Sequence, residues 1–290
     1  MHPSSPFTSR CKRVARRSFV AVSCGVFGSV VALGLATSLQ ACSSDTEATT
    51  GKRVVLHTRV QMNELATKTF TTEQGWNITL TAAAVSAGPF YYFDGTPPLV
   101  LGERHDSWQY ASRVLGLGTA HAHPGHYQAG NAMGEMRESS SLDLLGEAVD
   151  FPDGEGITGT YRSARFTFAP ASGPAKKLLG AHVAVAEGIA EKDGEEPRYF
   201  RAYADLETIE YSVAEAKIEG CELTEVDVEG DGTITVTINP KIWFDFLDFT
   251  DAEAGSADAP VEFAEGSAQQ IAFVLGVTQL SAYKFSYSSP

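Results

Sequence analysis

Three imidazoles lie within six residues of this chain, and they are the side chains best suited to chemistry. His121, His123 and His126 are three of only seven histidines in the 290-residue sequence. If the stretch begins extended, the first two rings point to the same side, because side chains alternate along a strand. The Pro-Gly pair that follows suits the centre of a type II turn, which holds its end residues within about 7 Å. The spacing therefore lets all three rings meet at one point.

Such a meeting point suits a transition metal, because neutral imidazole is a common metal ligand. Three further side chains follow within ten residues and are candidate helpers: Met133, Glu135 and Met136. Thioether sulfur favours copper, Cu(I) in particular, whereas a carboxylate oxygen favours zinc. The alternative for the two methionines is gap filling in a hydrophobic core, and the alternative for the histidines is a surface turn without a metal. The sequence predicts a copper or zinc site here and leaves the choice of metal open.

Other potential ligands are more isolated. His105 precedes the cluster by one expected hairpin, and whether it joins the site is open. His57 and His182 lie in expected strands, which favours structural roles. Cys221 is the only cysteine of the expected mature domain. It is a metal ligand, a reactive thiol or a small buried apolar residue, and the last reading is favoured.

The first 41 residues have the pattern of a secretory signal peptide. Five basic residues and no acidic one lie in residues 10–17, ahead of an apolar run that extends from Phe19 to Leu39. Arg16-Arg17 suits a loose twin-arginine signal, and a Sec signal with extra arginines is an equal alternative. A retained transmembrane anchor is a third reading, since the run is long enough to span a bilayer. Small residues before a cysteine favour cleavage.

The end of this segment, Leu39-Gln40-Ala41-Cys42, resembles the lipobox of bacterial lipoproteins. The resemblance implies cleavage before Cys42, a diacylglycerol group on its sulfur, and attachment to a membrane through that lipid. In that family an Asp after the cysteine retains the protein in the inner membrane. Ser43 and Ser44 stand here instead, which implies the outer membrane. The string from His121 to Glu135 also resembles one in uncharacterised bacterial envelope lipoproteins, a resemblance that implies no activity.

Composition limits the partners. Removing residues 1–41 leaves 17 basic and 36 acidic residues, a net charge of −19. Nucleic acid is excluded as a partner, because binding it needs a basic surface. Residues 42–52 are small and polar and are expected to form a flexible tether. Residues 53–290 show no repeat and no internal linker, so we expect a single β-rich domain.

Apolar residues in that domain alternate with polar ones, or form short aromatic runs, as in β-strands. Turn residues separate these runs, which predicts a mainly β fold: an antiparallel β-sandwich or barrel-like domain with few short helices. Strands are expected at residues 54–58, 76–81, 90–93, 159–168, 182–186, 199–203, 232–238 and 283–287.

Helix signals are few. Ser267 is a candidate N-cap for a short helix that ends at Gly276. Residues 205–217 fit either a helix or a strand, and residues 250–268 are expected to form an acidic surface loop.

Two acidic glycine-rich stretches read as turns. Asp227–Gly232 resembles the first half of an EF-hand loop, but Ile238 stands where the twelfth ligand is expected. A hairpin turn at Glu229–Gly232 is the favoured reading. Asp153–Gly156 is likewise expected to be a turn.

Together these patterns predict an exported, lipid-anchored envelope protein that binds copper or zinc through its histidine turn, for metal handling or delivery to an envelope partner. One rival is a structural or adhesive lipoprotein with no metal role. A less favoured rival is a metal-dependent enzyme, which needs an open coordination position and a general base. The H-x-H-x-x-H spacing resembles that of metallo-β-lactamase-like hydrolases, but Gly125 replaces their Asp. A binding role is therefore favoured over catalysis.

Overall fold

The computed structural model describes residues 51–63, 69–98 and 127–290. All of them belong to one compact unit, Asp45–Pro290. The fold is mainly β, with a closed barrel, a second sheet and a few short helices, so the expected fold class is confirmed. In the described part, no helix has both the length and the apolar character needed to cross a lipid bilayer.

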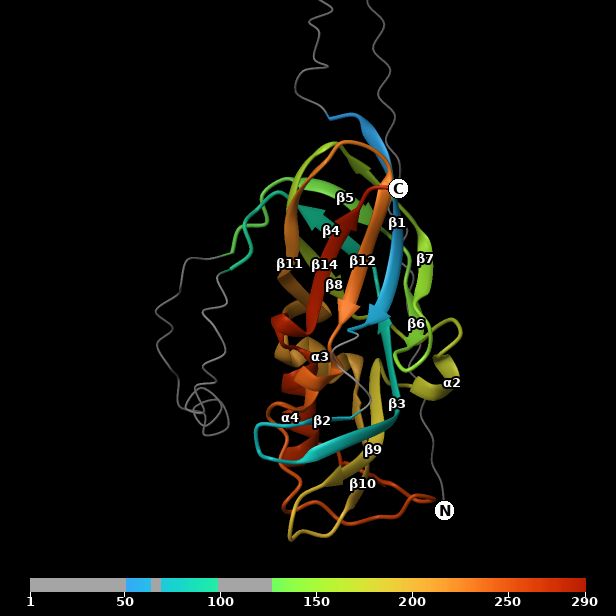
Figure 1. Cartoon of the computed structure of the whole chain (residues 1–290), viewed down its shortest axis with the longest axis vertical. Helices are drawn as coiled ribbons and strands as arrows, with labels where there is room; N and C mark the ends of the chain where they lie inside the picture. Colours follow the sequence, from blue (N-terminus) through green and yellow to red (C-terminus); the bar gives the residue numbers. More distant parts are fainter. Residues whose placement is uncertain (1–50, 64–68, 99–126) are drawn as a thin grey trace, which may run out of the picture. The chain divides into compact units, whose positions relative to one another are not determined.

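Eight strands of the described part close into a barrel in the order β1-β12-β14-β11-β8-β4-β5-β7 (Figure 1). Most neighbours are antiparallel, but β12 runs parallel to β1 and β14 runs parallel to β11. The barrel strands are β1 (Arg53–Met62), β4 (Phe90–Phe93), β5 (Ala132–Met136), β7 (Val149–Ile157), β8 (Gly159–Thr167), β11 (Lys217–Val228), β12 (Gly232–Ile238) and β14 (Tyr283–Ser288).

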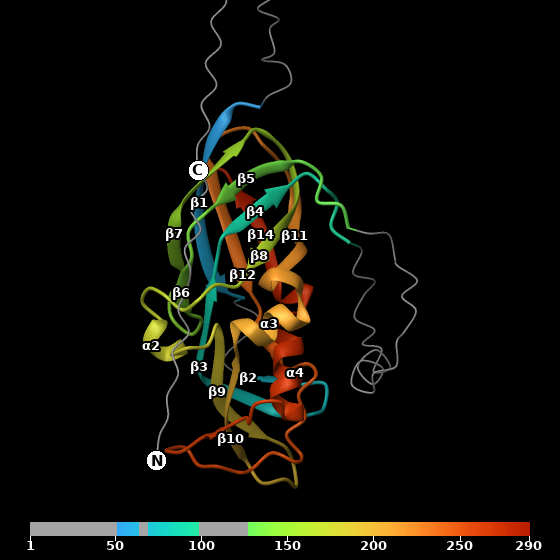
Figure 2. The same ribbon diagram turned by 180° about the vertical axis from the view of Figure 1, so that it is seen from behind.

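A second sheet adjoins one end of the barrel (Figures 1 and 2). Its strands follow the order β13-β10-β9-β3-β2, and β6 pairs with part of β3. The strands of this sheet are β2 (Thr69–Thr71), β3 (Asn77–Ala87), β6 (Ser140–Asp143), β9 (Ala184–Glu191), β10 (Arg198–Ala204) and β13 (Val261–Glu262).

The helices pack around the second sheet and its junction with the barrel. The longest of them in the described part, α4, packs against β10 and against the 3₁₀ helix η3. They are α2 (Lys176–Leu179), α3 (Leu206–Ser212), α4 (Ala268–Val277), η2 (Ala214–Ala216), η3 (Pro240–Phe244) and η4 (Leu280–Ala282).

Alternation in the sequence explains the barrel wall. In β1, Val54, Leu56 and Val60 are buried. Val55, which lies between the first two, is exposed, and so are the flanking residues Arg53 and His57. β12 alternates buried and partly buried residues and coincides with the expected strand 232–238. Each strand therefore turns one face to the core and the other to solvent, as the period of two requires.

Aromatic rings fill the barrel interior. Phe166 stacks on Tyr283 with ring centroids 4.0 Å apart. Phe90 contacts Phe166 at 5.4 Å and Phe285 at 5.8 Å. All four rings are at most 2% exposed and belong to one cluster that continues into the second sheet. The barrel is thus a packed core.

The two ends of the barrel have different roles, which follow from the strand directions. β1, β5, β8 and β12 begin at one end, and β4, β7, β11 and β14 finish there. We call it the upper end, as in Figure 1. It holds the start of β1, the two described flanks of the β4–β5 connection, the β7–β8 and β11–β12 connections and the C-terminus. The connections to the second sheet leave from the opposite, lower end.

One expected turn and one expected hairpin are wrong. Asp153–Gly156 lies inside β7, because its glycines serve close strand contact: a Cβ on Gly154 would lie 2.7 Å from the Glu135 carbonyl oxygen. Glu229–Gly232 does not close a hairpin, because β14 lies between β11 and β12. The turn instead crosses the end of β14, where the Tyr287 hydroxyl donates to the Gly230 or Asp231 carbonyl at 3.0 and 3.1 Å.

The helix expectations are partly confirmed. Ser267 caps α4, and its hydroxyl accepts from the Gln270 amide at 3.1 Å. Gly276 does not end α4 but lies inside it, where a Cβ would come within 2.6 Å of the Trp243 carbonyl carbon. The ambiguous stretch 205–217 forms α3 and η2 before β11 begins. The expected loop 250–268 contains the short strand β13.

Candidate functional site

The predicted histidine ligands fall outside the described residues. His121, His123 and His126, together with His105, lie in the stretch 99–126, and Cys42 lies in 1–50. The structure does describe both flanks of the histidine stretch, which form the connection from β4 to β5. It also describes the three candidate helpers on β5.

The flanks are tied together beside the upper end of the barrel. The Asp94 carboxylate accepts hydrogen bonds from the Asn131 backbone amide at 2.7 Å and from its side-chain amide at 2.8 Å. Gly95 donates its amide to the Ala129 carbonyl at 2.9 Å. The hydrogen bonds from Asn131 hold the pKa of Asp94 below its ordinary value of 3.8. We call residues 94–98 and 127–131 the stem.

The stem packs on the outside of β8 and β11. The Tyr127 hydroxyl lies 2.7 Å from the Ser163 hydroxyl, which donates to the Gly95 carbonyl at 2.6 Å. A Cβ on Gly220 would lie 2.7 Å from Pro98 and 3.2 Å from the Tyr127 ring. Both flanks of stretch 99–126 therefore meet at Gly220, and Tyr127 is the residue directly after His126. Sequence reasoning missed this stem, although Asp94-Gly95 was recognisable as the stop of a strand.

The three candidate helpers on β5 do not converge. Met136 is fully buried and belongs to the hydrophobic core, so the gap-filling reading applies to it. Glu135 is ion-paired with Arg137. Met133 is partly buried against the core, and its methyl group lies close to Gly159. Adjacent strand positions face opposite sides, which is why Glu135 and Met136 are separated.

An open groove of about 720 Å³ lies where β5, β7 and β1 approach the upper end, and Met133 and Glu135 line it. Glu155 on β7 stands directly opposite Glu135. Lys52, Arg53 and Asp231 also contribute charges. Within residues 51–63, 69–98 and 127–290, no three His, Cys, Asp or Glu side chains are grouped so as to hold one metal ion.

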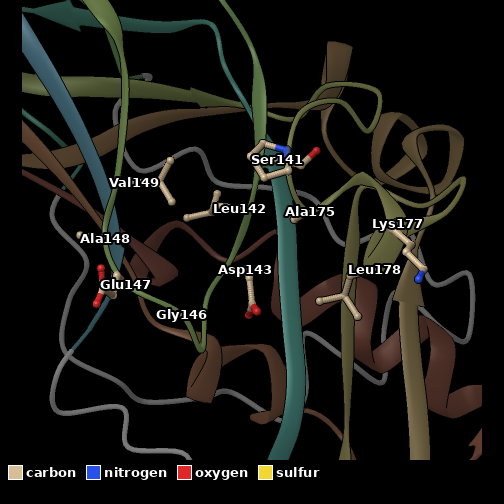
Figure 3. Close-up of a pocket in the computed structure, with 11 residues that line it drawn as sticks. Ser141, Leu142, Asp143, Gly146, Glu147, Ala148, Val149, Ala175, Lys177 and Leu178 are labelled. Carbon is tan, nitrogen blue, oxygen red and sulfur yellow. The ribbon is translucent and has the colours of Figure 1, made fainter.

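A second open groove, of about 600 Å³, lies between β6, the turn into β7 and α2 (Figure 3). Leu142, Val149 and Leu178 supply apolar lining. Asp143 and Lys177 add opposite charges. None of the residues that the sequence singled out for chemistry lies in this groove.

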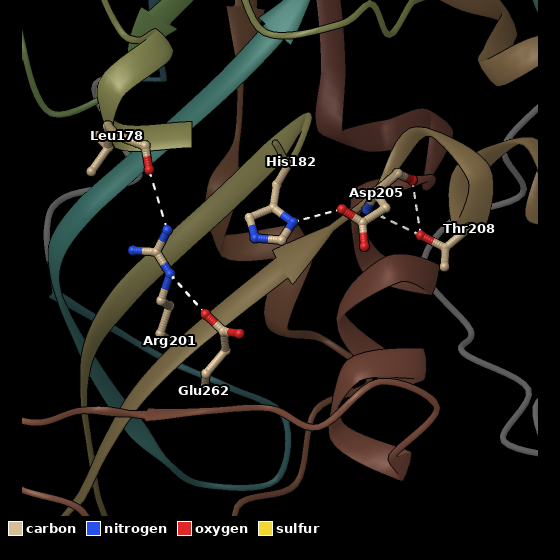
Figure 4. A network of polar contacts seen from close by, with 6 residues as sticks. All are labelled: Leu178, His182, Arg201, Asp205, Thr208 and Glu262. Carbon is tan, nitrogen blue, oxygen red and sulfur yellow. Dashed lines mark hydrogen bonds and ion pairs between the residues drawn. The ribbon is translucent and has the colours of Figure 1, made fainter. Parts of the chain in front are cut away.

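The two described histidines are bound to carboxylates of the protein. His57 Nδ1 lies 2.7 Å from the Asp153 carboxylate on the barrel wall. His182 Nδ1 lies 2.6 Å from Asp205 (Figure 4). The His182 ring also packs on Tyr203, with ring centroids 4.3 Å apart. These contacts agree with structural roles. His182 lies just before β9 rather than within it.

The polar network around His182 continues across the second sheet. Arg201 pairs with Glu262 at 3.2 Å and donates to the Leu178 carbonyl at 3.3 Å (Figure 4). It is also ion-paired with Glu187. Thr208 donates its hydroxyl to the Asp205 carbonyl at 2.8 Å and so fixes the start of α3. The network ties α2, β9, β10, β13 and α3 together.

Cys221 is fully buried on β11. Burial raises the pKa of its thiol to about 12, and the thiol donates to the Ile218 carbonyl at 3.5 Å. Since the thiolate is the nucleophile and the metal ligand, this protonated group is suited to neither role. The favoured reading of Cys221 as a small buried residue agrees with its position.

No protein-family model, curated protein or solved structure matches this chain.

Proposed function

We propose that this protein is a lipid-anchored envelope protein that binds one copper or zinc ion through His121, His123 and His126 and hands it to an envelope partner. The observation that carries the proposal is the spacing of the three histidines around a Pro-Gly turn. Capture and release of an ion need neutral imidazoles and no catalytic base.

The stem supports this proposal. A metal site on a long connection is more precise when its supports are rigid. Here Asp94 and Asn131 join the two flanks by two hydrogen bonds, and Tyr127 attaches the flank that follows His126 to Ser163 on β8. The packed barrel beneath the stem serves as the scaffold.

The position of the stem also suits a protein tethered to a membrane. The described chain enters at Gly51 and begins β1 at Arg53, and the stem leaves the same, upper end of the barrel. Nine peptide units separate Cys42 from Gly51, which span at most about 30 Å when fully extended. A lipid on Cys42 would therefore keep the end that bears the histidine stretch close to the membrane surface.

Among the candidate helpers, Met133 fits best. It lies two residues after the stem and lines the groove with a partly buried thioether, which would favour Cu(I). Glu135 would favour zinc but is engaged by Arg137. Met136 is a core residue and is left out of the proposal.

Metal analysis of protein purified from the envelope tests the proposal. We expect about one equivalent of copper or zinc in the wild type and almost none in a variant with all three histidines replaced by alanine. His57→Ala is the matched control, because it removes an exposed histidine of the barrel wall. A wild type without bound metal, or a triple variant with unchanged metal, would favour the structural or adhesive rival.

The anchor needs its own test. Mass spectrometry of the mature N-terminus should detect diacylglycerol on Cys42, and Cys42→Ser should move the protein from the membrane fraction to the soluble fraction. If the protein carries no lipid on Cys42 and still fractionates with membranes, the lipid anchor is contradicted.

A further inference from the structure

β5 and β7 are joined by one of the two shortest ladders of the barrel, and this ladder lies near the upper end. The described residues pair across it at only two positions, Gly134 with Gly156 and Glu135 with Glu155. One step further toward the upper end, an antiparallel ladder would set Met133 opposite Ile157, and no pairing continues there. The two strands therefore separate where β5 emerges from the stem.

A single phenol fills this separation. The Tyr161 hydroxyl lies 2.7 Å from the Met133 carbonyl oxygen and 2.9 Å from the Ile157 carbonyl oxygen. It also accepts the Ile157 amide at 3.3 Å. A phenol has one proton, so it donates to one carbonyl at a time and accepts with its oxygen. It thus replaces a missing rung of the ladder.

The surrounding residues keep the hydroxyl in place as a donor. Burial raises the pKa of Tyr161 to about 12, so it stays protonated at neutral pH. A Cβ on Gly156 would lie 2.5 Å from the hydroxyl oxygen and 2.7 Å from Leu56. Glycine at this position therefore provides the room that the hydroxyl needs.

We propose that the Tyr161 hydroxyl is a latch that fixes the start of β5 to the end of β7 and thereby positions Met133 and the stem. The latch itself depends only on these contacts. Its consequence for metal binding rests on the proposed function, because Met133 and the stem are the described supports of the histidine stretch.

Tyr161→Phe tests the latch, because it removes the hydroxyl and keeps the buried ring. The variant loses one donated hydrogen bond and leaves the Met133 and Ile157 carbonyls without the phenol as donor, which corresponds to roughly tenfold faster local opening. We expect the amide of Ile157 and those of residues 132–134 to exchange with solvent about tenfold faster, with little change in the second sheet. Tyr92→Phe is the matched control, since its ring is equally buried and its hydroxyl makes no hydrogen bond to β5 or β7 within the described residues.

A second variant, Gly156→Ala, displaces the hydroxyl without removing it and should raise exchange at the same amides. Unchanged exchange at Ile157 in Tyr161→Phe would overturn the latch, and so would an equal rise throughout the protein.

Titration with zinc or copper separates the latch from the proposed function. Several-fold weaker binding by Tyr161→Phe than by Tyr92→Phe would support the positioning role, and equal binding would refute it. If the wild type binds neither metal, the proposed function fails, whereas the exchange data still decide the latch.

Discussion

The two ends of the barrel are held by different forces. At the lower end, Trp243 packs edge-on against Phe273 at 6.0 Å, and Phe244 contacts the same ring at 5.8 Å. At the upper end, β5 pairs with β7 at only two positions, and β11 does not pair with the end of β14, because their two pairs lie near the start of β14. Tyrosine hydroxyls reinforce this end: Tyr161 joins β5 to β7, and Tyr287 ties the end of β14 to the β11–β12 connection.

The two kinds of contact differ in how easily they open. Buried aromatic area stabilises a domain through many small contacts and is lost only on large-scale unfolding. A region tied by a few hydrogen bonds opens locally at much lower free energy. The lower end is therefore expected to open only on large-scale unfolding, and the upper end is where hydrogen-bond variants are expected to cause local opening.

The largest expected effect is at the lower end. Trp243→Ala removes a fully buried ring and should lower the free energy of unfolding by about 3–5 kcal/mol. Tyr211→Ala is the control, because this aromatic side chain is 95% exposed on α3. Urea unfolding of both variants measures the difference. A loss below about 1 kcal/mol for Trp243→Ala would break the contrast between the ends.

A smaller effect is expected for Gly276→Ala in α4. In a helix this change ordinarily stabilises by about 1 kcal/mol. Here the added Cβ would lie 2.6 Å from the carbonyl carbon of Trp243. We therefore expect the free energy of unfolding to fall by about 1–3 kcal/mol, because the surrounding residues must repack. Gly230→Ala, at the upper end with open space around the new Cβ, should change stability by less than about 0.5 kcal/mol. Thermal unfolding of the two variants sharpens the contrast.

The stem should loosen on acidification without global unfolding. Hydrogen bonds from Asn131 lower the pKa of Asp94 in the folded protein below its ordinary value of 3.8. The stabilisation that ionised Asp94 gives the stem is therefore present above pH 3.8 and is lost as the pH falls through the lowered pKa. We expect amide exchange at Asn131, corrected for its intrinsic pH dependence, to rise in that range. Asp94→Asn should abolish the pH dependence. If the Asn131 amide is equally protected from exchange above and below this pH range, the proposed role of ionised Asp94 in holding the stem is contradicted.

The smallest effect is expected on the barrel wall between the two ends. Asp153→Asn removes the carboxylate charge beside His57, and both side chains are more than half exposed. Solvent screens such pairs, so the loss should stay below about 0.5 kcal/mol. A larger loss in urea unfolding would mean that polar contacts also stabilise the wall.

The sequence predicted those parts of the fold in which burial alternates. β12 lies where it was expected, because each second side chain of Gly232–Ile238 is buried. β7 was misread because Gly154 and Gly156 signal a turn, whereas Gly154 allows close contact with the backbone of β5 and Gly156 makes room for the side chains of Tyr161 and Leu56. The insertion of β14 between β11 and β12 depends on pairing between distant segments, which local patterns do not contain.

The candidate site was predictable only as a set of residue types. The spacing of the histidines is visible in the sequence, but the stem depends on Asp94 meeting Asn131 and Tyr127 meeting Ser163, contacts between separate strands. Met136 appeared to be a ligand because it is close to Met133 in sequence. Its inward position on β5 makes it a core residue instead.

The most direct test of the metal proposal is X-ray absorption spectroscopy of the full-length protein loaded with one equivalent of zinc. Three imidazole ligands predict a nitrogen shell at about 2.0–2.1 Å with the outer scattering of histidine rings, and this pattern should disappear in the triple His→Ala variant. A shell of water and carboxylate oxygens without ring scattering, or the same spectrum from the triple variant, would contradict the proposal that His121, His123 and His126 close around one ion.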